Sequence, residues 1–206
     1  MILPIVAYGD AILKKVALEI TPDYLELNLL IKNMFDTMYN ASGIGLAAPQ
    51  VGQSLRLFIV DTAQILNKKK SKAKGNMTEE DEDEPLKKDE KGIVQLFINP
   101  TIKTRTGQQF EYNEGCLSIP SIREDITRYS IIEIEYFDEQ LVKHTARYEG
   151  LAARVIQHEF DHIEGILFTD YLKPLRRTML KGKLENISKG KIEADYRMYF
   201  PNAKKR

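Results

Sequence analysis

Cysteine and histidine are scarce in this chain of 206 residues, which has one cysteine and three histidines. A single cysteine excludes an internal disulfide framework and suits a reducing compartment, so a cytoplasmic location is expected. No apolar run approaches the roughly 18 residues of a membrane-spanning helix, and no membrane partner is expected. Excess charge is also lacking, because Lys+Arg and Asp+Glu each number 30. This balance neither favours nor excludes nucleic acid as a partner.

The apolar patterns predict helices towards both ends of the chain and strands in its middle. Helices are expected over residues 21–43, from about Leu151 and from about Pro174. Strands are expected over residues 55–61, 93–98, 130–138 and 141–149, the last two as a hairpin. In the first helix, Thr21 is the expected cap and Gly43 the expected end. Because the order has no βαβ rhythm, the predicted class is α+β with antiparallel β-sheets.

Length and composition predict a single domain over residues 1–206 with two charged appendages. Residues 67–92 form a charged insertion that is almost without apolar side chains. Such a segment buries too little surface to offset its ordering entropy, so a flexible solvated loop is favoured over a partner-binding segment. Residues 173–206 form a basic helix and tail with eleven Lys or Arg. This tail is either a solvated surface or a docking face for a phosphate-rich partner.

The stretch QHEFDHIEG, residues 157–165, carries the clearest chemical signal. His158 and His162 are four residues apart, so on a helix they lie on one face and can bind one metal ion. Glu159 beside them can then move protons for a metal-activated water molecule. The alternative is an ordinary surface helix that happens to carry two histidines and several acids. The pattern alone names neither the reaction nor the third ligand.

A catalytic metal site of this kind needs a third protein ligand and an open position. Cys116, in the turn NEGCLSIPS, is the first-ranked candidate because its thiolate completes a Cys, His, His set. A lone cysteine is otherwise most often a small buried apolar residue. The many carboxylates stay open as alternatives, and His144 is expected to be structural or exposed.

The stretch SGIGLAAPQVG, residues 42–52, predicts an extended main chain that another chain can approach closely. It lacks the Lys-Ser/Thr of a phosphate-binding loop, so nucleotide binding is rejected. One interpretation is a tightly packed turn. The other is a strip of main chain that pairs with an extended substrate and ends in Gln50, whose amide can donate to an oxyanion.

Three stretches, GIGLAAPQ, EGCLSIP and QHEFDH, together resemble the signature motifs of the peptide deformylases in type, order and approximate spacing. The resemblance covers roughly residues 3–180, apart from the charged insertion. It implies antiparallel β-sheets around a central metal-binding helix, with an N-terminal and a C-terminal helix. It implies a hydrolase that removes the formyl group from the N-terminal formylmethionine of newly made proteins. N-formylmethionyl nascent peptides are then the expected partners, with ribosome docking through the basic tail as a further expectation.

The resemblance also implies the roles of individual residues. Cys116, His158 and His162 are the expected ligands of one divalent metal ion, with Fe(II) favoured and Zn, Ni or Co able to substitute. Glu159 is the expected general base and acid, and Gln50 and the Leu117 N–H the expected oxyanion donors. The expected substrate-binding residues are Ile44, Gly45, Gly115, Leu151, Arg123 and Arg154. Asp161 and Arg128 occupy the positions of a supporting acid–arginine pair, although ordinary surface charges are the alternative.

Arg154 departs from the resemblance, because relatives commonly have an aliphatic side chain there. We expect its stem to line the methionine pocket while its charged head reaches the rim; the alternative is a side chain turned fully to solvent.

Two rival functions remain to be distinguished. A peptidase that cuts internal peptide bonds needs a different third ligand, usually His or Glu, and EGCLS argues against it. A protein that binds ribosomes or nascent chains without catalysis is expected to have lost a ligand or Glu159, and all are present.

Overall fold

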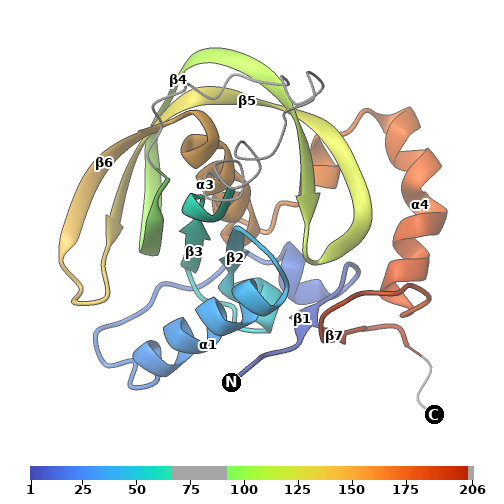
Figure 1. Ribbon diagram of the computed structural model, residues 1–206, viewed down its shortest axis with the longest axis horizontal. Coiled ribbons are helices and arrows are strands. Elements are labelled where there is room, and N and C mark those ends of the chain that lie inside the picture. The colour runs from blue at the N-terminus through green and yellow to red at the C-terminus, as the bar shows by residue number, and fades with distance from the viewer. Residues whose placement is uncertain (66–91, 204–206) are drawn as a thin grey trace, which may run out of the picture.

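A computed structural model describes residues 1–65 and 92–203 (Figure 1). The charged insertion predicted at 67–92 therefore lies, except for Gly92, outside the described residues. The strands are β1 Ile5–Val6, β2 Gly45–Ala47, β3 Leu57–Asp61, β4 Val94–Cys116, β5 Ile119–Phe137, β6 Lys143–Glu149 and β7 Met198–Tyr199. The helices are α1 Leu27–Asn40, α3 Gly150–Ile163 and α4 Pro174–Ser188, with 3-10 turns η1 Ala11–Lys14, η2 Ala48–Val51 and η4 Phe168–Tyr171.

Within the described residues the strands form a large sheet and a small one. The large sheet has the order β2-β3-β4-β5-β6, and all neighbours in it are antiparallel. The small sheet pairs β1 with β7 in parallel and joins the two ends of the chain. The predicted α+β class is therefore confirmed, with the β1–β7 pair as its parallel element.

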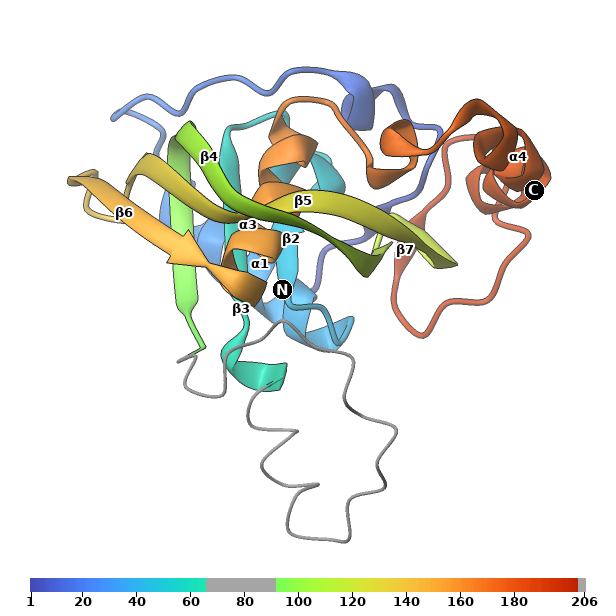
Figure 2. The same cartoon turned by 90° about the horizontal axis from the view of Figure 1, so that it is seen from above.

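Helix α3 is the central element of the fold. It packs against β2, β3, β5 and β6, and its buried apolar face shares a core with both ends of the large sheet. Figure 2 shows β4 and β5 running across α3, with β6 at one end of the molecule and α4 at the other. This enclosure explains why α3 is buried on most of its surface, although it carries several ionisable side chains.

The β4–β5 hairpin brings the lone cysteine to α3. Its register runs from Ile98 opposite Phe137 to Cys116 opposite Ile119, with bulges along the way. Leu117 and Ser118 form the turn between the two strands. Cys116 is thus the last residue of β4, and a two-residue connection follows it.

The first helix begins later than the sequence predicts. Residues 21–26 form turns, in which the N–H of Tyr24 donates to the carbonyl oxygen of Thr21, and α1 starts at Leu27. Leu25 is 98% exposed, so this segment has no buried apolar stripe that would favour a helix. At the other end, Ser42 rather than Gly43 adopts the left-handed conformation, with φ of 54°.

Candidate metal centre and active site

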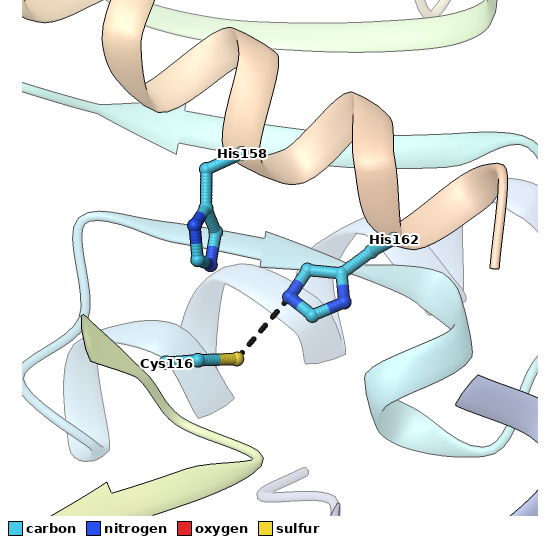
Figure 3. Close-up of side chains that lie close together, drawn as sticks. All are labelled: Cys116, His158 and His162. Atoms are coloured by element: carbon cyan, nitrogen blue, oxygen red, sulfur yellow. Dashed lines mark hydrogen bonds between the residues drawn. The ribbon is translucent and has the colours of Figure 1, made fainter. Parts of the chain in front are cut away.

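Cys116, His158 and His162 converge at one point between α3 and the end of β4 (Figure 3). Their ligand atoms all lie within 4.8 Å of one another. The Sγ atom of Cys116 is 3.2 Å from Nε2 of His162, and the two imidazole rings are 5.1 Å apart between centroids. The spacing of four residues on α3 thus gives the shared face that the sequence predicts.

The three residues fit a divalent metal ion by their donor chemistry. Glu114 Oε2 lies 2.9 Å from Nδ1 of His158, which leaves Nε2 of that ring for a metal. The Nδ1 atom of His162 is buried and finds no hydrogen-bond partner within residues 1–65 and 92–203, while its Nε2 faces the thiol. One sulfur and two imidazole nitrogens form a set that binds Zn, Fe, Ni or Co, and three protein ligands leave a position for water.

Glu114 is a functional residue that sequence reasoning missed. Its carboxylate binds His158 and also accepts hydrogen bonds from Arg128 Nε at 2.7 Å and Nη2 at 3.0 Å. Burial acts to raise the pKa of Glu114, but His158 and Arg128 outweigh it and hold that pKa far below its usual value. Glu114 therefore stays an anion that fixes the orientation of a metal-binding ring. Its position two residues before Cys116 on a strand, hence on the same face, is the signal that could have found it.

Arg128 and Asp161 lie together, as their expected pairing requires. Nη1 of Arg128 donates to Asp161 Oδ2 at 2.7 Å, and both side chains are buried. Arg128 therefore bridges Asp161 on α3 and Glu114 on β4. The pair is not a surface feature, because it extends the ionic network behind His158.

Arg154 corrects the expectation that its head reaches solvent. The residue is 2% exposed. Its Nη1 donates to Glu114 Oε1 at 3.0 Å and to the carbonyl oxygen of Ile126 at 2.8 Å. Its Nη2 donates to the carbonyl oxygen of Phe110 at 2.7 Å, and the guanidinium lies over the Phe110 ring. Buried acceptors on β4 and β5 hold the charge inside, so it is neither at the rim nor turned to solvent, although the residue does line the cleft.

Glu159 is buried beside the candidate ligands. It is 4% exposed, and its Oε2 has no hydrogen-bond partner among the residues that the structure describes. Burial raises the pKa of Glu159 to about 7, which suits a group that accepts and donates protons. Gly45 makes room for it, because a Cβ atom at Gly45 would lie 2.3 Å from Oε1 of Glu159. Gly45, in the stretch GIGLAAPQ, thus leaves the space that the side chain of Glu159 in QHEFDH occupies.

Gln50 presents its amide nitrogen to the site. Its Oε1 accepts from the backbone N–H of Ala47 at 2.8 Å, which fixes the direction of the amide group. Nε2 then lies 3.4 Å from Cys116 Sγ and 3.3 Å from Ser118 Oγ. An amide donor held beside Cys116 in this way can also stabilise negative charge that develops on a substrate oxygen.

A cleft of about 600 Å³ opens onto these groups. Its lining includes every expected substrate-binding residue: Ile44, Gly45, Gly115, Leu151, Arg123 and Arg154. Arg123 is exposed and bonds Asn113, with Nε 2.8 Å from Asn113 Oδ1. His144 lies outside the cleft, 2.6 Å from Asp138 Oδ2. The C-terminal residues 193–196, which sequence reasoning did not place at the site, also line the cleft.

A sulfur–nitrogen–nitrogen donor set, a buried acid and a neutral amide donor thus face one cleft at the end of a central helix. This combination defines the class of the protein as a metal-dependent hydrolase with a general acid–base carboxylate.

Comparisons with known proteins specify this class further. The family model described as polypeptide deformylase matches residues 2–178. A peptide deformylase of Christiangramia forsetii is 55% identical over 205 residues, covering 100% of this chain and 99% of that protein. A peptide deformylase of Flavobacterium johnsoniae is 49% identical, covering 100% and 99%. The crystal structure of a peptide deformylase from Legionella pneumophila is 34% identical with a TM-score of 0.73, covering 93% of this chain and 98% of that one.

The chain therefore belongs to the polypeptide deformylase family. Members of this family are metal-dependent hydrolases that remove the formyl group from N-terminal methionine, and the predicted family, fold class and deformylase activity are confirmed. Within residues 1–65 and 92–203, no helix combines the length and the hydropathy needed to cross a membrane.

Proposed function

We propose that this chain deformylates N-formylmethionyl nascent chains with Cys116, His158 and His162 holding one divalent metal ion. The proposal rests above all on one observation: the buried carboxylate of Glu159 and the oriented amide of Gln50 flank the same three donors. A thiolate and two imidazoles suit Fe(II), the metal we propose for the cell, and also Zn, Ni and Co. The proposed setting is the cytoplasm.

When bound, the metal ion supplies Lewis-acid chemistry that makes water a nucleophile near neutral pH. Glu159 takes a proton from the attacking water as the new C–O bond forms at the formyl carbon. Glu159 then delivers this proton to the leaving amine as the C–N bond breaks, so that formate and a free N-terminal methionine result. The burial of Glu159 supports this role, because a carboxyl group with a raised pKa exchanges protons readily near neutral pH.

Gln50 Nε2 and the backbone N–H of Leu117 are the proposed donors to the oxyanion of the tetrahedral intermediate. Their support is geometric, since Gln50 faces the Cys116–Ser118 turn and Leu117 follows the Cys116 ligand directly. Each such donor contributes about 3–4 kcal/mol to catalysis in other hydrolases.

Among the described residues β2 is an outer strand of the large sheet, and its outer edge is the proposed docking strip for the substrate main chain. The carbonyl oxygen of Ile44 already accepts from the N–H of Asp61 at 2.8 Å, so it points towards β3. In an antiparallel ladder the next residue along points the other way, and Gly45 pairs with Val60 without hydrogen bonds. We therefore assign the outward N–H and C=O of Gly45 to the substrate. The apolar parts of Ile44, Leu151 and Arg154 then receive the methionine side chain.

One experiment separates this function from that of a peptidase. The metal-loaded protein, purified without oxygen, is incubated with a formylmethionyl tripeptide, and the products are resolved by mass spectrometry. The proposal predicts formate and an intact tripeptide with a free amino group. Cleavage of an internal peptide bond without formate release would favour the peptidase instead.

Ribosome docking through the basic tail remains a proposal of its own. Helix α4 buries Leu180, Leu184 and Ile187 in a core shared with β5, so a truncation within α4 would also damage the fold. Charge exchange is the sharper test, because Lys181 and Lys183 are exposed. We expect Lys181→Glu with Lys183→Glu to weaken sedimentation with ribosomes while hydrolysis of short peptides continues. Equal sedimentation would refute docking.

A further inference from the structure

The chain segment after α4 returns to the active-site cleft. It lies beyond residues 2–178, the part that the family model matches. Residues 193–196 line the cleft, and β7 directly after them pairs with β1 in the small sheet. Figure 1 shows β7 beside β1, with the C-terminal segment leading back from the end of α4. The segment thus has a fixed place at the site and is not a free tail.

Tyr196 is the residue through which this segment touches the site. Its hydroxyl lies 2.7 Å from the carbonyl oxygen of Leu117. A carbonyl oxygen can only accept, so the tyrosine hydroxyl is the donor. The ring of Tyr196 packs against the core around α1, which holds the hydroxyl in place.

The turn that carries Leu117 is held from three directions. Tyr196 binds the Leu117 carbonyl oxygen, and the N–H of Tyr8 donates to the Ser118 carbonyl oxygen at 2.8 Å. Gln50 Nε2 lies 3.3 Å from the Ser118 hydroxyl oxygen. The Leu117 carbonyl and the Leu117 N–H lie on adjacent peptide groups, joined through the φ and ψ angles of Leu117. Because Cys116 and Ile119 anchor both ends of this short turn in strands, fixing the carbonyl leaves the Leu117 N–H less freedom to change direction.

We infer that Tyr196 is a positioning residue for deformylation, whose hydroxyl aims the Leu117 N–H at the substrate oxyanion through the Leu117 carbonyl. The inference rests on the proposed role of that N–H. It assigns a role in the reaction to the C-terminal segment, which lies beyond the residues that the family model matches. It also predicts a role for one hydroxyl group, separate from the packing of the ring that bears it.

The test is Tyr196→Phe, which removes the hydroxyl and keeps the ring. We expect kcat on a formylmethionyl tripeptide to fall about tenfold, because a misdirected donor loses part of its effect on the transition state. KM, the bound metal per chain and the melting temperature stay close to those of the unmodified protein. The matched control is Tyr148→Phe, which removes another half-buried hydroxyl, 3.4 Å from that of Tyr136 and outside the cleft. Its kcat should not change.

A second readout is independent of turnover. The backbone ¹⁵N shift of Ser118 reports on the peptide group whose oxygen Tyr196 binds, and it should move in Tyr196→Phe but not in Tyr148→Phe. An unchanged kcat and an unchanged Ser118 shift would each overturn the inference. A fall in kcat accompanied by an equal loss of metal and of folded protein would also overturn it, because Tyr196 would then be structural. If the unmodified protein released no formate, the proposed function would fail, and the Ser118 shift would still decide whether the hydrogen bond forms.

Discussion

The two sides of the candidate metal site are built by different means. On the helix side, His158 is backed by a buried ionic network of Glu114, Arg128, Arg154 and Asp161. On the turn side, the Cys116–Ser118 segment is held by hydrogen bonds from an amide, a backbone N–H and a tyrosine hydroxyl. Charge therefore supports His158, whereas neutral groups support the turn that carries Cys116.

The difference predicts different consequences of damage. A buried charge that loses its partner destabilises a protein by about 3–5 kcal/mol. A neutral hydrogen bond contributes only about 0.5–1.5 kcal/mol. Substitutions on the helix side should thus impair folding and metal binding together, while substitutions on the turn side should impair turnover in a protein that still folds and binds metal.

The largest effect on stability is expected from Glu114→Gln. Neutralising this carboxylate leaves Arg128 and Arg154 as buried cations with one fewer anion and weakens the hold on His158. The free energy of unfolding should fall by about 3–5 kcal/mol, and metal affinity by about 10–100-fold. Denaturant titration and competition with a chelator measure these two quantities.

The matched control for Glu114 is Glu124→Gln. Glu124 also pairs with an arginine, but its partner Arg176 is half exposed and the pair lies outside the cleft. Here the loss should be about 1 kcal/mol or less, with metal affinity unchanged. Equal losses of stability and of metal affinity in the two variants would show that the ionic network behind His158 contributes no more than an ordinary ion pair.

Gln50→Ala is the corresponding test of the turn side. Removing the amide should lower kcat by about 10²–10³-fold, as expected for the loss of one oxyanion donor. The buried N–H of Ala47 loses its acceptor, so stability should fall by about 1–3 kcal/mol. Steady-state kinetics and metal analysis on the same sample check the prediction. A loss of metal in proportion to the loss of activity would contradict it.

Arg154→Met is expected to have a smaller effect than Glu114→Gln. Glu114 keeps Arg128 and His158 as partners, while the carbonyl oxygens of Phe110 and Ile126 lose their donor. Stability should fall by about 1–3 kcal/mol. Because the charged head is buried, the ratio of kcat/KM for acidic and neutral tripeptides should not change. A shift in that ratio would show that the guanidinium reaches the substrate.

The smallest effect is expected for Lys32→Ala on the surface of α1. Lys32 pairs with Asp36 one helical turn away, and its side chain is 68% exposed. Such pairs contribute about 0.3–0.5 kcal/mol, so the melting temperature should barely move and activity should stay the same. A loss above 1 kcal/mol in denaturant titration would be inconsistent with this assignment.

Spacing in the sequence was sufficient to predict that His158 and His162 lie side by side, because residues four apart on a helix share a face regardless of tertiary context. Spacing did not select a third ligand, since many carboxylates stayed open beside Cys116. The extent of β4 and β5 was not predictable in the same way, since most side chains between Thr101 and Asn113 are exposed and carry no apolar alternation. The predicted start of α1 was wrong because the sequence of residues 21–26, which form turns, resembles a capped helix start.

The position of Glu114 two residues before Cys116 was a sequence signal, but the contacts of the supporting groups needed the three-dimensional structure. Glu114 binds His158 across 44 positions of sequence, and Tyr196 binds Leu117 across 79. Neither separation leaves a periodic signal. The predicted position of the Arg154 guanidinium was wrong, because main-chain oxygens of β4 and β5 accept its hydrogen bonds. A sequence pattern does not predict which main-chain oxygens lie near a side chain.

The most direct test of the account is Glu159→Gln, measured for bound metal and formate release on one sample. The account predicts one metal ion per chain, as in the unmodified protein, and a rate of formate release lowered by about 10²–10⁴-fold. That result would assign proton transfer to Glu159 and show that Glu159 itself is not needed to hold the metal. Formate release at the unmodified rate, with metal bound, would contradict the central claim.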